Sequence, residues 1–270
     1  MMSSTTLQEP LIVKGVNWIG LYTLVAKEVR RFVKVYWQTI VAPVITTVMY
    51  YLVFSVAFGS GGGRADVEGV PYLVFLWPGL LMMGMAQNAF ANTSSSLIIG
   101  KIQGSIVDVL MPPLSAGELL TGYVVGGLLR GILVGIATVV VMVPFAHLPV
   151  THVWAICAYG LVGSLLMALL GVLAGIWADK FDHMAAVTNF IIMPLTMLSG
   201  TFYSANHLSP TFEWLAHLNP FFYMNDGFRY GFIGHADMPL VVGLTMLSAI
   251  SLGLWVLCWA LLKNGYKIRT

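Results

Sequence analysis

Long apolar stretches separated by short polar segments dominate the chain. Five stretches contain no Asp, Glu, Lys or Arg, namely residues 35–63, 69–100, 131–178, 183–212 and 238–262. A helix needs about 20 residues to cross a bilayer, so the stretch 131–178 is long enough for two crossings. Pro144 and Pro149 lie near its middle and interrupt a helix. The pattern predicts an all-α polytopic membrane protein with six spans, at residues 36–58, 72–92, 119–143, 153–177, 184–202 and 238–262.

Composition supports this interpretation. The chain is 58% hydrophobic and 9% charged, whereas soluble domains carry about 25% charged residues. A formal net charge of +2 is too small for the basic field that holds nucleic acid, so we expect no nucleic-acid partner. No short apolar core with a small-residue cleavage site precedes the first span, so we also expect no removed signal peptide.

Basic residues in the connections predict the orientation, because positively charged loops stay in the cytoplasm. One side carries ten Lys or Arg residues, and the other carries only Arg64 and Arg229. Both termini are therefore expected in the cytoplasm. Arg130 lies inside the third span, and we expect its side chain to reach toward the inner headgroups.

Residues 14–35 are predicted to form an interfacial helix at the inner surface of the membrane. Its apolar residues recur at spacings of three and four and are Trp18, Leu21, Val25, Val29, Phe32 and Tyr36. The cations lie mostly off this stripe and are Lys27, Arg30, Arg31 and Lys34. An apolar stripe beside a basic face is typical of interfacial helices. A plain cytoplasmic extension of the first span is the alternative.

The inner loop is predicted to contain a short amphipathic helix at residues 97–110. Its apolar face carries Ile98, Ile102, Ile106 and Val109, and the polar residues Lys101, Gln103 and Asp108 are interspersed. The Pro-Pro pair at 112–113 ends it. Such a helix can dock on a partner or lie on the lipid surface. Ser115 and Glu118 then have the spacing of a capping box, which predicts a new helix start.

Residues 203–237 are predicted to lie outside, yet they are rich in aromatic side chains. Pro210, Pro220 and Gly227 interrupt the segment too often for an ordinary span. We expect two short re-entrant helices between spans 5 and 6, dipping into the outer leaflet. The aromatic residues expected to embed in lipid are Phe221, Phe222, Phe228 and Phe232. A small cap packed on the bundle is the alternative.

Arg229 lies within this apolar segment, so its charge needs a partner. Asp226, Glu213 and a lipid phosphate are the candidates. We hypothesise that Arg229 pins the hairpin and, with Phe221, Phe222 and Tyr223, seals the outer side of a transport pathway. The alternative is an isolated arginine whose charge contributes little.

No catalytic, cofactor or metal site is predicted in this chain. Gly100-Lys101 is followed by Ile102, and Ser95 stands where a Walker motif has its first glycine. The six histidines show no ligand spacing. The spans also offer essentially no ionisable group for ion coupling near the midplane. A transporter of this kind is passive or takes its energy from a partner.

A transport pathway is expected along the second and fifth spans. Its candidate residues are flexible or polar and are Met83, Gln87, Asn88, Asn92, Met193 and Met197. Methionine adapts to varied apolar ligands, and amides in lipid are costly enough to face inward. Ordinary packing is the alternative for the methionines. Gly127, Gly131 and Gly135 give the third span a smooth face for packing on a neighbour.

Three stretches resemble the ABC-2 type transport permeases. They are Phe75-Leu-Trp-Pro-Gly-Leu-Leu81, Leu110-Met-Pro-Pro-Leu-Ser-Ala-Gly-Glu-Leu-Leu-Thr-Gly122 and Asn219-Pro-Phe-Phe-Tyr-Met-Asn-Asp-Gly-Phe-Arg-Tyr-Gly231. The last is the most specific, because it carries the proline, aromatic residues and arginine of the family signature. The resemblance covers residues 20–265.

The resemblance implies a half-transporter of a bacterial inner membrane. Two copies of this chain would work with two separate ATP-binding subunits, which bind ATP and Mg, and would export an amphipathic or lipid-linked substrate. Residues 97–110 would be the coupling helix, 14–35 the connecting helix and 203–237 the re-entrant helices. A passive channel or a membrane enzyme acting alone is the alternative, and no residue selects the substrate.

The charge distribution leads to a test of the orientation. In a background without Cys157 and Cys258, we expect Ser60→Cys to react with an impermeant maleimide from the outside of intact cells. Ser105→Cys should react only after the cytoplasmic side is opened, because positive loops stay inside. The opposite labelling pattern would reverse the orientation.

Overall fold

The chain forms an elongated helical bundle. The computed structural model describes residues 15–59, 66–67, 69–145, 149–203, 214 and 216–267. Its elements are α1 (Trp18–Lys34), η1 (Trp37–Val41), α2 (Ala42–Gly59), β1 (Asp66–Val67), β2 (Val70–Pro71), α3 (Tyr72–Ile102), α4 (Ile106–Leu110), α5 (Ala116–Met142), α6 (Val153–Trp177), α7 (Phe181–Val187), η2 (Thr188–Ile192), α8 (Met193–Met197), α10 (Pro220–Ile233) and α11 (Leu240–Lys263). The two short strands pair antiparallel.

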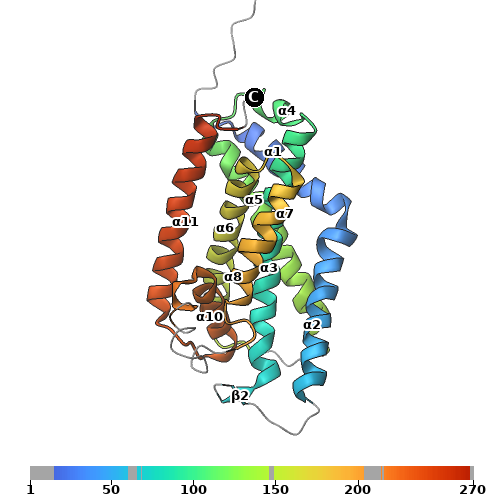
Figure 1. The fold of residues 1–270 in the computed structure, drawn as a ribbon, viewed down its shortest axis with the longest axis vertical. Coiled ribbons are helices and arrows are strands. Elements are labelled where there is room, and N and C mark those ends of the chain that lie inside the picture. Colours follow the sequence, from blue (N-terminus) through green and yellow to red (C-terminus); the bar gives the residue numbers. More distant parts are fainter. Residues whose placement is uncertain are drawn as a thin grey trace, which may run out of the picture.

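Five helices in the described part of the chain are long and apolar enough to cross a membrane. They are Trp37–Ala57, Tyr72–Ile102, Ala116–Met142, Val153–Trp177 and Leu240–Lys263. Each coincides with a predicted span, so the all-α polytopic fold is confirmed. In Figure 1, α1 and α4 lie at one end of the bundle, and β2 and α10 lie at the other. Which end faces the cytoplasm stays a prediction.

The sixth predicted span, 184–202, is not a comparable helix. The segments α7, η2 and α8 run through residues 181–197. At about 1.5 Å per residue, this segment is roughly 25 Å long, which is shorter than the hydrocarbon core of about 30 Å. The helix ends at Met197, and Gly200, three residues later, has a positive φ of 71° that a helix could not contain. A sixth full crossing is therefore not confirmed.

Helix α3 forms the centre of the bundle and packs against α2, α5, α6 and α10. Glycines of its neighbours allow this close packing. A Cβ atom on Gly127 would lie 3.0 Å from the carbonyl oxygen of Ala89, and one on Gly131 would lie 2.8 Å from that of Met85. The predicted smooth face of the third span is confirmed, and its neighbour is α3.

Helix α3 is ten residues longer than the predicted span 72–92, because it continues to Ile102. Its polar residues after position 92 look like a membrane exit in the sequence, but they have partners inside the bundle. The Thr93 hydroxyl, for example, donates to the carbonyl of Ala168 at 2.8 Å. A helix can therefore continue through this stretch without leaving the protein interior.

The predicted helix 97–110 is wrong as a single element. Residues 97–102 are the end of α3, and α4 begins only at Ile106. Gly104 between them has a φ of 71°, a left-handed conformation that breaks the helix. The inner loop is thus a sharp turn followed by one short helix.

The segment 203–237 contains one described long helix, α10. The predicted first half of the hairpin falls largely on residues 204–213 and 215, which lie outside the described residues. The aromatic residues expected in lipid, Phe221, Phe222, Phe228 and Phe232, are buried inside the protein. That expectation was wrong because α10 packs against α3, α6 and α11, which cover its aromatic side chains.

The α3–α6 contact can be tested at Gly171. A Cβ atom there would collide with the Thr93 hydroxyl oxygen and the Phe90 carbonyl oxygen. We expect Gly171→Ala to destabilise the protein by about 1–3 kcal/mol, because a backbone oxygen cannot move aside cheaply.

The matched control is Gly253→Ala on α11, where a Cβ atom would meet no atom within 4 Å. Thermal unfolding in detergent should show a lower midpoint for Gly171→Ala alone. Equal midpoints for the two variants would contradict the close contact.

Candidate functional site

A polar cavity lies between α3 and the α7–η2–α8 segment. Its volume is about 410 Å³. Helix α3 contributes Gln87, Asn88, Phe90, Ala91, Ser94 and Ser95, and the opposite wall contributes Met184, Thr188, Ile192 and Met193. Gln87 donates to the Thr196 hydroxyl at 3.3 Å, which links the two walls. The cavity combines hydrogen-bonding groups with flexible methionines, so it suits a ligand that is partly polar.

This cavity brings together three of the predicted pathway residues, Gln87, Asn88 and Met193. The other three lie elsewhere. Met83 belongs to a buried apolar cluster, against which Met197 packs. Asn92 is fully buried and bonded to α1. Packing, the alternative interpretation, describes Met83 and Met197 better.

An ion pair within α1, between the buried Glu28 and the partly buried Arg31, is hydrogen-bonded to α3 beside this cavity. Glu28 is 0% exposed, and its carboxylate accepts hydrogen bonds from Ser96 at 2.7 Å and from Arg31 at 3.1 Å. Arg31 also donates to Asn92 Oδ1 at 3.0 Å and to Ser95 at 3.1 Å. Each charge thus has a partner of opposite sign and further hydrogen bonds, which the buried carboxylate of Glu28 requires.

The sequence interpretation of α1 missed this pair. The buried face of α1 consists of Leu24, Glu28 and Phe32, whereas Trp18 of the predicted stripe is exposed. Lys27, Arg30 and Lys34 are exposed as expected, but Arg31 turns inward. A glutamate four residues from two apolar positions on one helical face was the available signal. The interfacial location of α1 stays a prediction.

Arg130 is buried near the middle of the 27-residue helix α5. Its guanidinium donates to Asn88 Oδ1 on α3 at 3.0 Å. The expectation that it reaches the inner headgroups is wrong, because its side chain turns toward α3. The expectation that the spans hold essentially no ionisable group was wrong for the same residue. The signal was present, since Arg130 is the only charged residue between 119 and 178.

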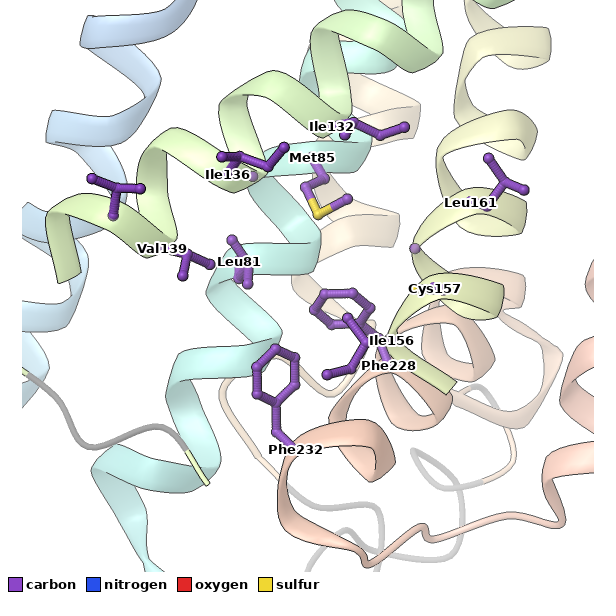
Figure 2. A pocket seen from close by; sticks show the side chains of 13 residues that line it. Leu81, Met85, Ile132, Ile136, Val139, Ile156, Cys157, Leu161, Phe228 and Phe232 are labelled. Atoms are coloured by element: carbon purple, nitrogen blue, oxygen red, sulfur yellow. The ribbon is translucent and has the colours of Figure 1, made fainter. Parts of the chain in front are cut away.

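A second cavity, of about 500 Å³, is almost wholly apolar. Figure 2 shows side chains from α3, α5, α6 and α10 around it, among them Met85, Ile136, Ile156 and Phe228. Its lining holds no polar side chain other than the Cys157 thiol. It offers nothing to recognise a polar group, so the polar cavity is the better candidate for substrate recognition.

Arg229 ties α10 to the turn that follows α8. It is 2% exposed, donates to the carbonyl of Gly200 at 2.5 Å, and its guanidinium carbon lies 3.8 Å from the ring centre of Phe75. Because Arg229 is buried, a lipid phosphate is excluded as its partner. Glu213, the second candidate, lies outside the described residues. The third candidate, Asp226, interacts electrostatically with Arg229. A Cβ atom on Gly79 would lie 3.2 Å from Arg229, so the absence of a side chain at Gly79 leaves room for the guanidinium group.

Neighbouring polar residues of α10 bind the connections on either side of this helix. Asn225 donates to the Ser199 hydroxyl at 2.9 Å, and the Asp226 carboxylate accepts the amides of Asp237 at 2.9 Å and Met238 at 3.0 Å. The resemblance stretch 219–231 therefore holds the turn that follows α8 and the turn that follows α10. The remaining predicted seal residues, Phe221, Phe222 and Tyr223, are buried in the same region.

The opposite end of the bundle carries a second set of charges. Lys101 donates to the carbonyl of Ile176 at 2.9 Å and lies 3.5 Å from Asp179. Lys267 donates to Asp179 at 2.6 Å, and this hydrogen bond holds the pKa of Asp179 below its usual value. The ammonium groups of Lys101 and Lys267 donate to the last carbonyls of α6, and their positive charge interacts favourably with the helix dipole. Lys101, predicted as a coupling residue, therefore has partners within the chain.

The predicted coupling residues divide into buried and exposed groups. Ile98 and Ile106 are buried in the bundle, so they cannot present an apolar face to a partner. Ile102, Gln103 and Asp108 are exposed. Two further apolar residues that the prediction omitted, Val107 and Met111, are also exposed. The available apolar surface of this loop therefore consists of Ile102, Val107 and Met111, which we call the inner-loop surface.

The predicted capping box is present at the start of α5. Ser115 Oγ accepts the Glu118 amide at 3.3 Å, and Glu118 Oε2 accepts the Ser115 amide at 2.6 Å. The other carboxylate oxygen accepts the amide of Asn17 at 2.5 Å, just before α1. One side chain thus satisfies amides at the starts of two helices, which supports the packing of α1 on α5.

Comparison with known proteins identifies the family. Residues 20–233 match the model of the ABC-2 type transporter family. The chain is 39% identical over 254 residues to "Inner membrane transport permease YadH" of Escherichia coli K12, covering 94% of this chain and 98% of that protein. It is 22% identical over 243 residues to "Nodulation protein J" of Neorhizobium galegae, covering 87% and 88%. Together with the five apolar helices, these matches support a multi-pass transport component of the inner membrane, and the chain belongs to the ABC-2 type transporter family.

Proposed function

We propose that this chain is the membrane subunit of an ATP-driven exporter of an amphipathic or lipid-linked substrate. Two copies would form the membrane part, and two separate ATP-binding subunits would bind ATP and Mg and supply the energy. Family membership supports the partnership, because it implies an ATP-binding subunit. Nodulation protein J and the transport permease are related proteins whose names do not assign a substrate to this chain.

The polar cavity is the observation that carries this proposal. It lies on α3, a helix long enough to cross the membrane. Its serine, asparagine and glutamine side chains can bind a polar head, and Met184 and Met193 can adapt to an apolar chain. A passive channel for small polar solutes would have no use for the methionine wall, so an amphipathic cargo fits better.

The inner-loop surface is the proposed contact with the ATP-binding subunit. Ile102 and Val107 line the same shallow hollow beside Lys101 and Asp179. The loop is fixed to α3 and, through Lys101, to the end of α6. Movement of a bound partner would therefore act on the two helices that pack most extensively on each other.

The proposal can be tested by co-purification with a charge placed on the inner-loop surface. We expect the tagged chain to retain a soluble ATP-hydrolysing subunit, and Val107→Asp to weaken this binding at least about tenfold, because it buries an unpaired charge in the contact. Val150→Asp is the matched control, because Val150 lies at the other end of the bundle. The two valines are equally accessible, since Val107 is 56% exposed and Val150 is 55% exposed.

Partner binding would be quantified on variants that elute as monodisperse species with unchanged unfolding midpoints. Ile106→Asp should instead lower the midpoint, because Ile106 is buried. Full partner binding and normal ATP hydrolysis with Val107→Asp would remove the coupling role. Failure of the unmodified chain to retain any ATPase would favour a channel or an enzyme acting alone.

A second test concerns the proposed outer seal. Arg229→Ala would release the turn at Gly200 and the stacking on Phe75, so we expect faster dye leak from proteoliposomes and more uncoupled ATP hydrolysis. Arg229→Lys should rescue only part of this effect, because lysine lacks the planar guanidinium.

The exposed Arg30→Ala is the control for loss of an arginine. Each variant would first be checked for assembly with the ATPase. If Arg229→Ala and Arg229→Lys both matched the parent in leak and in basal hydrolysis, Arg229 would have no sealing role.

A further inference from the structure

The charges beside the polar cavity do not cancel. The guanidinium groups of Arg31 and Arg130 donate to side chains that line the cavity, and the carboxylate of Glu28 pairs with Arg31. Glu28 accepts from Arg31 at 3.1 Å, so these two neutralise each other. Arg130 is buried and donates to the neutral amide of Asn88. None of the ion pairs in the described part of the chain includes Arg130. One positive charge is left over.

This surplus charge lies deep in the membrane part of the protein. Arg130 is near the middle of α5, and Asn88 is near the middle of the 31-residue helix α3. A buried charge without a counter-charge is expensive at such a depth, and buried arginines are usually paired. The isolated chain therefore provides no anion that would neutralise the charge of Arg130.

A second copy of the chain has no suitable carboxylate to supply. The sequence contains no Asp or Glu in residues 29–65, 69–107, 119–178, 183–212 or 238–270. The five apolar helices that can span the membrane therefore carry no acidic residue in their central parts. The Glu28 of a second copy would be occupied by its own Arg31. The central parts of the spanning helices therefore cannot supply the missing anion, from this copy or from a second one.

Both guanidinium groups lie one side chain behind the wall of the polar cavity. Asn88 lines the cavity and accepts from Arg130. Ser95 lines the cavity and accepts from Arg31 at 3.1 Å. An anion in the cavity would lie close to the surplus charge, and screening is weak in this interior, so their attraction would be stronger than in water.

We propose that the polar cavity binds the anionic group of its amphipathic cargo, a phosphate or a carboxylate, and that Arg130 supplies the attraction through Asn88. This inference rests on the proposed function, because it names the substrate class of the same site. A neutral amphiphile of equal length would leave the Arg130 charge uncompensated. Selectivity for the charged head therefore follows from the buried arginine rather than from the apolar lining.

A matched pair of probes tests this selectivity. A fluorescent dodecyl phosphate and its uncharged dimethyl ester have the same chain and differ in charge. In nanodiscs of phosphatidylcholine alone, we expect the full-length chain to bind the phosphate about tenfold more tightly than the ester, as expected for one charge-assisted contact. Arg130→Gln should remove this preference, and the exposed control Arg30→Gln should keep it.

A second variant allows the inference to be tested even if Arg130→Gln does not fold. Asn88→Asp places a carboxylate beside Arg130, so it should raise the unfolding midpoint and also abolish the preference for the phosphate probe. The probe should raise the midpoint of the parent and leave that of Asn88→Asp unchanged. A parent without preference, or an Asn88→Asp variant that keeps it, would overturn the inference.

Changing the lipid composition distinguishes the two possible sources of the anion, a membrane lipid and the transported substrate. If phosphatidylglycerol stabilises the parent over Arg130→Gln while the phosphate probe binds no better than its ester, the anion is a membrane lipid and the substrate-class inference is overturned. Binding in nanodiscs requires no ATPase. A chain that couples to an ATPase without anion preference would overturn this inference alone, and a chain that prefers anions without retaining an ATPase would overturn the proposed function alone.

Discussion

Polar groups inside a hydrocarbon medium must find their partners within the protein, and helix α3 provides many of these partners. Its serine and asparagine side chains bind the Glu28–Arg31 pair of α1, its Asn88 binds Arg130 of α5, and its Lys101 satisfies the last carbonyls of α6. Since unpaired polar groups in lipid cost several kcal/mol, by order of magnitude, these contacts restrict how the helices can be arranged. The position of α3 therefore determines the position of its neighbours.

Much of the helical fold could be predicted from the gaps between charged residues. Those gaps reflect the thickness of the bilayer, and five of the expected spans coincide with long apolar helices. The Ser115–Glu118 capping box was predictable because both of its partners lie within four residues. The length of α3 was not predictable in this way. Its later polar residues are paired with α1 and α6, and a pattern along one helix does not reveal such distant partners.

The candidate site could be predicted only in part, for the same reason. Polarity alone identified Gln87 and Asn88, which line the cavity, but it also selected Asn92, which accepts a hydrogen bond from Arg31 of the ion pair. Arg130 was missed because it was assigned to the inner headgroups, and Glu28 was missed because the whole of residues 14–35 was assigned to the membrane surface. Helical periodicity suggested Ile98 and Ile106 as contact residues, although Gly104 divides the segment and both isoleucines are buried. Local patterns identify polar and apolar positions, whereas long-range contacts decide which of them are accessible.

The shared carboxylate of Glu118 has a consequence for biogenesis. Asn17 and Glu118 are 101 positions apart, so α1 leaves the ribosome well before the side chain that caps it. At about 5–20 residues per second, the delay is roughly 5–20 s. During that interval the amide before α1 needs another partner, such as water, and the helix must dock only after α3 and the start of α5 have been made. Of the described helices, α1 is thus synthesised first, yet it can complete this contact only after the start of α5 has been made.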